Sequence, residues 1–169
     1  MYDLNGAEIK KDRLRFTKNK LSSTLIILSI VANALYFVSV YRSDVGSYYY
    51  NITIGASVVY NLVFMLTAFL CSEGCKNYKK SYCFVAVVLG VLQVLRIFYI
   101  PLNALNEPSP IVGAAEGETV MAAGQFTYIA VLLCASAALL ILAGVIGIAK
   151  TTTLNNYQAE LDRKSKGSK

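Results

Sequence analysis

The chain has 169 residues, of which 56% are hydrophobic and only 15% are charged, and its mean hydropathy is +0.51. A typical soluble domain has about 25% charged residues, so this composition argues against an ordinary water-soluble fold. The sequence contains no His, the commonest general base and metal ligand. We therefore expect no enzyme activity, no cofactor and no metal site.

Residues 1–20 form a polar arm, in which six Lys and Arg side chains precede the first apolar run. Asn5 and Glu8 have the spacing of a helix N-cap and its acidic partner, so a short helix is predicted to begin directly after Asn5. Only Ile9 and Phe16 share an apolar face, which favours a weak interfacial helix. The basic cluster is interpreted as a topology signal, with binding to anionic lipid as the alternative.

The first predicted membrane-spanning helix covers residues 21–41. The tripeptide at 32–34 has the Ala-x-Ala form of a signal-peptide cleavage site. The apolar run nevertheless continues through Leu35, Phe37 and Val38. We therefore predict an uncleaved helix.

Three further spans are predicted at about 51–71, 82–100 and 126–149. The last of these has 24 residues and no charged side chain. At a rise of about 1.5 Å per residue it covers roughly 36 Å, which is enough to cross a hydrocarbon core of about 30 Å. Pro101 is expected to end the third span.

The two segments after the third and fourth spans differ in composition. The connection 101–125 contains all three prolines of the chain and neither Lys nor Arg, so it is predicted to be mainly a loop. In the tail, 150–169, Leu154, Tyr157 and Leu161 recur at helical spacing and basic residues follow them. This pattern predicts a short amphipathic helix on the membrane surface with a frayed end.

The distribution of charge predicts the topology. The arm 1–20, the loop between the second and third spans, and the tail 150–169 hold 14 of the 16 Lys and Arg residues, leaving only Arg42 and Arg96. By the positive-inside rule both termini are then cytoplasmic. The net charge of +6 reflects this topology, and no nucleic-acid partner is expected. The predicted fold is all-α: a polytopic cell-membrane protein whose residues 21–149 form a four-transmembrane-helix bundle within the lipid bilayer.

Each predicted span carries one face of polar or small residues, which should point toward the other spans. These faces are Ser22, Ser29, Asn33 and Tyr36 in the first span; Thr53, Ser57 and Asn61 in the second; Ala86, Gly90 and Gln93 in the third; and Ala130, Cys134, Ala137 and Gly144, with the pair Ala143 and Gly147, in the fourth. Small residues allow close backbone approach in lipid, and polar groups find partners across the seam. We accordingly expect Cys134 to be buried.

Asn33, Asn61, Gln93 and Arg96 form the candidate polar cluster, because Asn33 and Gln93 should lie at a similar level a little outward of the midplane, with Asn61 nearer the centre. They are interpreted as a dry seam of mutual hydrogen bonds, with a polar pocket or pore as the alternative. Arg96, the one charge within a span, is expected to reach the outer surface and to pair with Asp44, with a glutamate of the outer loop as the next choice. Alternatively, Arg96 binds an anion beside Gln93 and Asn33.

Cys71, Cys75 and Cys83 gather at the cytoplasmic ends of the second and third spans. A reducing cytoplasm argues against disulfides, and a C-x3-C pair with a distant third thiol and no His is a poor zinc signature. No span contains Asp or Glu, which argues against a proton-driven carrier of the small multidrug type. The cysteine pattern of tetraspanins and the Trp-containing signature of claudins are also absent.

Two functions remain after these exclusions. The first is a non-enzymatic accessory or structural subunit, which docks a protein partner, or a second copy of itself, through small-residue helix faces and basic cytoplasmic surfaces. The alternative is an oligomeric transporter or channel for a small solute, whose polar path is lined by Asn33, Asn61, Gln93 and Arg96.

Overall fold

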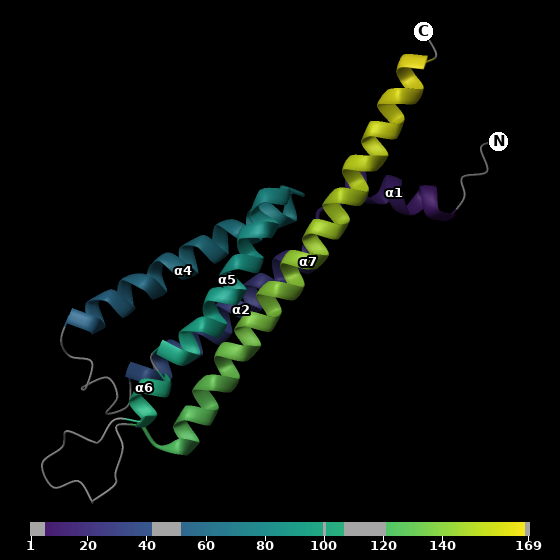
Figure 1. Ribbon diagram of the computed structural model, residues 1–169. Helices are drawn as coiled ribbons and strands as arrows, with labels where there is room; N and C mark the ends of the chain where they lie inside the picture. The colour runs from purple at the N-terminus through teal and green to yellow at the C-terminus, as the bar shows by residue number, and fades with distance from the viewer. Residues whose placement is uncertain (1–5, 42–51, 100, 107–120, 168–169) are drawn as a thin grey trace, which may run out of the picture.

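The computed structural model describes residues 6–41, 52–99, 101–106 and 121–167, with the side chains of 41, 52–54, 103–104 and 167 excepted. Within these residues every regular element is a helix (Figure 1). The helices are α1 (Gly6–Phe16), α2 (Lys20–Tyr41), α4 (Ile52–Lys76), α5 (Lys80–Tyr99), α6 (Pro101–Asn106) and α7 (Ala123–Gly167).

Helices α2, α4, α5 and α7 are each long and apolar enough to cross a membrane. Each overlaps one predicted span, although α4 and α7 extend beyond the predicted ends, and the expected short helix after Asn5 is α1. The third span ends before Pro101, which begins α6 at a position where its missing N–H is not needed. The prediction for the tail differs from the structure, because α7 continues without a break to Gly167 and there is no separate surface helix.

The four long helices form a ring in which α7 packs against α5 and α2, and α4 packs against α2 and α5. Helix α4 therefore lies on the side of the bundle away from α7 (Figure 1). The end that carries the α4–α5 turn is called here the turn end, and the opposite end, which carries α6, is called the α6 end.

Small residues bring α5 and α7 close together. A Cβ atom added to Gly144 would lie 2.7 Å from the backbone oxygen of Cys83, and one added to Gly90 would lie 3.0 Å from that of Ala137. Gly147 faces the Cys83 thiol in the same seam. Such close approach maximises van der Waals contact, which is the main source of helix association in lipid.

Paired serines join α2 to its two neighbours. The hydroxyls of Ser29 and Ser136 lie 2.8 Å apart between α2 and α7, and those of Ser23 and Ser72 lie 2.8 Å apart between α2 and α4. Each pair is also bonded to the opposing backbone, since Ser29 donates to the carbonyl of Ser136 and Ser72 donates to that of Ser23. These bonds fix the height of α2 relative to α4 and α7.

A left-handed residue closes the turn between α4 and α5. Tyr78 has a φ of 57°, the one positive φ among the non-glycine residues described. The amide of Lys79 donates to the carbonyl of Gly74, and the amide of Tyr78 donates to that of Cys75. This pair of bonds is the Schellman motif, which satisfies the last carbonyls of α4 and reverses the chain within three residues.

The bundle buries polar as well as apolar side chains and exposes many large apolar ones. Its buried polar residues are Asn19, Ser22, Ser23, Ser29, Asn33, Asn61, Ser72, Gln93, Arg96, Ser136 and Thr151. Large apolar side chains on all four helices face outward, among them Leu35, Leu66, Leu95 and Val131. Such a surface would be unstable in water but suits hydrocarbon, so the four candidate spans suggest a multi-pass membrane protein.

The last turns of α7 project beyond the turn end, with α1 beside them (Figure 1). The Tyr157 hydroxyl donates to the Asp12 carboxylate over 2.6 Å, and Lys11 lies 3.8 Å from Glu160. We call α1 together with residues 152–167 of α7 the projecting arm. It holds the basic side chains of both chain ends on one unit.

The face of α7 that enters the bundle is partly the predicted one. Ala137, Ala143, Gly144 and Gly147 are buried as expected. The prediction for Cys134 was wrong, because its thiol is exposed on the outward side of α7. The buried face of this helix instead begins at Ile129 and continues through Leu133 and Leu140. Cys134 does not lie on this face.

Candidate functional site

Three of the four predicted site residues form a hydrogen-bonded chain across α2, α4 and α5. The amide of Gln93 donates to Asn33 Oδ1 over 2.9 Å, and the amide of Asn33 donates to Asn61 Oδ1 over 3.4 Å. Their exposed fractions are 0% for Gln93 and Asn33 and 2% for Asn61. Helical spacing places each amide on the inward face of its helix, and the similar depth of the three positions lets them meet.

Arg96 completes this chain from the last turn of α5. Its Nη1 donates to Asn61 Oδ1 over 2.7 Å, and its side chain is only 6% exposed. The expectation that Arg96 reaches the surface was therefore wrong. Arg96 follows Gln93 by three residues and shares its inward face, and the partial negative charge at the C-terminus of α5 favours a cation there.

Two aromatic rings cover the guanidinium. Its central carbon lies 4.5 Å from the ring centroid of Tyr36 on α2 and 4.9 Å from that of Tyr60 on α4. Cation–π contacts of this kind contribute about 0.5–2 kcal/mol each, and more when water is excluded. The rings hold the cation in place without neutralising it.

Within the described residues, four buried polar atoms of the cluster have no hydrogen-bond partner: Asn61 Nδ2, Gln93 Oε1, and Nε and Nη2 of Arg96. Three of them are donors. Leaving a buried donor or acceptor unpaired costs about 1–3 kcal/mol, and more for a charged group. The site is thus a bonded network with an excess of unused donors beside a cation.

No described carboxylate neutralises Arg96. The two ion pairs found within the described residues are Lys11 with Glu160 and Lys76 with Glu73, both far along the chain from the site. Asp44, the expected partner of Arg96, lies outside the described residues. Among the residues that the structure describes, the positive charge of Arg96 is therefore not balanced by a negative side chain.

Tyr60 was not predicted to be part of the site, and Tyr36 was placed on the inward face of the first span but not in the cluster. Their positions in the sequence could have indicated them, because Tyr36 follows Asn33 by three residues on α2 and Tyr60 directly precedes Asn61 on α4.

Asn19, at the turn end, was also not predicted to make contacts between helices. Its side chain donates to Ser22 and accepts from Lys150, and its backbone amide bonds the last carbonyl of α4, on Lys76.

The three thiols at the turn end are close together but form no recognisable metal site. Cys71, Cys75 and Cys83 are free and buried. Within the described residues no group of His, Cys, Asp and Glu side chains has the arrangement needed to hold a metal ion. Their place in the α4–α5–α7 core is one of packing.

Comparison with known proteins gives no relative for this chain. No protein-family model, no curated protein sequence and no solved structure matches it. The proposals that follow consequently depend on the geometry of the chain itself.

Proposed function

We propose that this chain is a non-enzymatic accessory or structural subunit of a larger complex in the cell membrane, with both termini in the cytoplasm. The proposal is carried by one observation: Asn33, Asn61 and Gln93 bond to one another and are almost completely buried. A carrier or channel would use such groups to contact a solute. In this chain the three amides instead connect α2, α4 and α5 through hydrogen bonds.

The projecting arm is the surface we assign to the partner. It carries exposed basic residues on α1 and on the last turns of α7, namely Arg13, Arg15, Arg163, Lys164 and Lys166. Phe16 is 80% exposed beside them. The small residues of α7, in contrast, already pack against α5 and are not available to a partner. The projecting arm is therefore the better docking surface.

The test is purification from native membranes in a mild detergent, with identification of the proteins that co-elute. We expect one membrane protein in stoichiometric amount, and its loss when Arg163, Lys164 and Lys166 are all replaced by Glu. The matched control is replacement of Lys79 and Lys80 by Glu, since these are exposed cations at the same end of the bundle. Recovery of the chain alone from native membranes would contradict the proposal.

The alternative function, a small-solute transporter or channel, is favoured by the unpaired donors of Arg96 and Asn61. It predicts solute flux in liposomes that contain the purified chain alone. An accessory subunit predicts none.

A further inference from the structure

We propose that the unpaired edge of Arg96 binds the carboxylate of an amphiphilic acid, whose alkyl tail lies in the membrane along α4 and α5. This inference concerns a ligand site and stands apart from the proposed role as a subunit. It begins from the two donors on that edge, which are buried and unused.

The geometry of arginine selects the ligand. Nε and Nη2 lie on one edge of the guanidinium plane, and their N–H bonds are parallel at the spacing of two carboxylate oxygens. Nη1, on the other edge, is already bonded to Asn61. A carboxylate on the free edge would make two charge-assisted bonds and would neutralise the cation.

The surrounding atoms favour an acceptor ligand over a donor. Asn61 Nδ2 is a third unpaired donor of the cluster, while Gln93 Oε1 is its one unpaired acceptor within the described residues. The Tyr36 and Tyr60 rings contact the guanidinium through their faces and leave it a full positive charge. An anion relieves more of these unsatisfied groups than a neutral alcohol or amide can.

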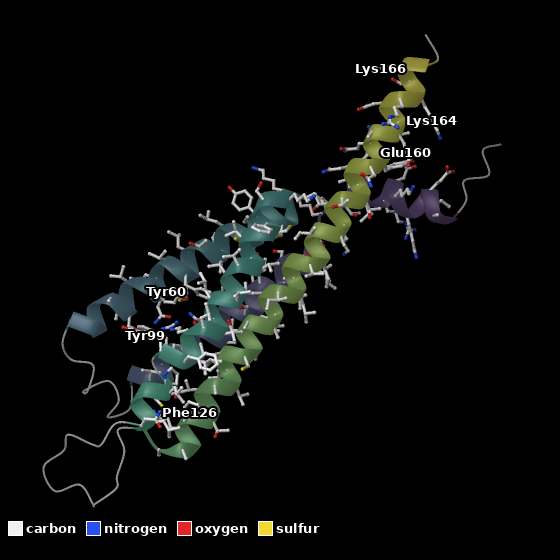
Figure 2. All side chains as sticks on the ribbon, in the orientation of Figure 1. Tyr60, Tyr99, Phe126, Glu160, Lys164 and Lys166 are labelled. Carbon is white, nitrogen blue, oxygen red and sulfur yellow. The ribbon has the colours of Figure 1, made fainter. Side chains whose placement is uncertain are left out.

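Helix α4 provides the route to the site. From Asn61 toward the turn end, its inward face is buried at every turn, at Phe64, Ala68, Cys71 and Cys75. Toward the α6 end, residues 55–60 include no buried side chain. In Figure 1 this part of α4 lies apart from α5, and Figure 2 labels Tyr60 on it.

Depth explains why the acid should be amphiphilic. Arg96 lies in the last turn of α5, near the end of a candidate span. The side chains along the outward faces toward the turn end are apolar, such as Leu62 and Leu66 on α4 and Leu92 on α5. A carboxylate at the level of Arg96 would sit near the membrane surface while its tail lies against these residues.

The chain contains no Trp, so a single Tyr60→Trp substitution provides a fluorescent reporter beside the guanidinium. The matched control is Tyr128→Trp on α7, where the side chain is 51% exposed and lies on another helix. Each variant is placed in phosphatidylcholine nanodiscs at pH 8 and titrated with octanoate, and separately with octanol. We expect a saturable fluorescence change with octanoate in the Tyr60→Trp variant only, and an affinity at least tenfold weaker for octanol.

Two substitutions in the Tyr60→Trp background test the contact itself. Arg96→Lys keeps the charge but removes the two-donor edge, so octanoate affinity should fall at least tenfold. Asn61→Asp is nearly isosteric and places a carboxylate beside Arg96 within the chain. It should also abolish the octanoate response while the melting temperature stays the same or rises, which excludes misfolding as the cause.

Any of the following results would overturn the proposal. One is an equal response to octanoate and octanol, or an unchanged octanoate affinity in the Asn61→Asp variant. Another is a response that appears only after Asp44→Asn, because the chain would then provide its own counter-charge. The last is a saturable response to a Leu-rich synthetic transmembrane peptide with a single Glu but none to octanoate, which would assign the site to a partner helix.

Discussion

The two seams of the bundle are built in different ways. Between α5 and α7, small residues allow the backbones to approach so closely that an added Cβ at Gly144 would lie 2.7 Å from a carbonyl oxygen. Around α4 the buried apolar side chains, such as Phe64 and Ala68, are accompanied by polar contacts between helices, through the Ser23–Ser72 pair and the amide chain that includes Asn61. The first seam depends on close backbone packing, whereas the second combines apolar packing with hydrogen bonds between side chains. The buried face of α4 ends at Asn61, before the α6 end is reached.

This difference indicates which part of the molecule is rigid and which part can accept a ligand. Close backbone packing is intolerant of added volume, because interiors are filled to crystal-like density. Hydrogen bonds between side chains can be exchanged for bonds to another acceptor at little net cost. We therefore place the binding site at the α4 seam and the structural support at the α5–α7 seam.

The largest effect is expected from added volume in the tight seam. Gly144→Val should lower the free energy of unfolding by about 3 kcal/mol, because the clashing atoms include the backbone oxygen of Cys83 and cannot move cheaply. The measurement is reversible unfolding in mixed micelles, followed by circular dichroism. Gly55→Val is the matched control, since no described atom lies within 4 Å of a Cβ at Gly55. Equal losses in the two variants would show that the seam is not tightly packed.

A smaller loss is expected from the centre of the polar seam. Asn33→Ala removes the bonds to Gln93 and Asn61 and leaves the Gln93 amide unpaired, so it should cost about 2 kcal/mol. The same unfolding measurement, repeated for Gln93→Ala and for the double variant, gives the coupling energy. We expect about 0.5–1 kcal/mol of coupling. Fully additive losses would be inconsistent with the bond between these two side chains.

The serine pairs should contribute less than the amides. Ser29→Ala and Ser23→Ala should each destabilise the fold by about 0.6–1 kcal/mol, because each removes one hydroxyl pair between helices. Thr67→Ala provides the control, since the Thr67 hydroxyl bonds only the carbonyl of Val63 within its own helix. If Ser23→Ala lowers the free energy of unfolding no more than Thr67→Ala does, the serine pair does not stabilise the α2–α4 seam.

The smallest effect is expected on the outward side of α7. Cys134→Ala should change the free energy of unfolding by no more than about 0.5 kcal/mol, because the thiol is exposed. In detergent, an apolar maleimide should label Cys134 first, and should reach the buried Cys71, Cys75 and Cys83 only on unfolding. Labelling of Cys83 at the rate of Cys134 would contradict the inward orientation of this part of α5.

Much of the polar cluster could be predicted, because helical spacing and depth are both properties of the sequence. Asn33 and Gln93 fell on predicted inward faces at similar depths, and the structure joins them at 2.9 Å. Arg96 follows Gln93 by three residues, so its inward direction was also available. It was misjudged because a charge near the end of a span was assumed to prefer the surface, whereas Asn61 and two tyrosine rings bind it within the bundle.

The length of α7 could also have been found. No Gly or Pro occurs between Lys150 and Lys166, so nothing in the local sequence breaks the helix where the apolar run ends. The change from apolar to polar composition was interpreted as a change of structure. Helix continuity depends on the backbone, and composition only changes what surrounds it.

By itself, the sequence determined the all-helical class and the positions of the four long apolar helices, because a run of apolar residues in hydrocarbon must satisfy its backbone within its own helix. Only the tertiary structure decided how far each helix is rotated about its axis. That rotation buries Ser136 and Ala137 but exposes Cys134, and it directs Arg96 toward Asn61. It is set where two backbones approach most closely, at Gly90 and Gly144, and this approach depends on residues far apart in the chain.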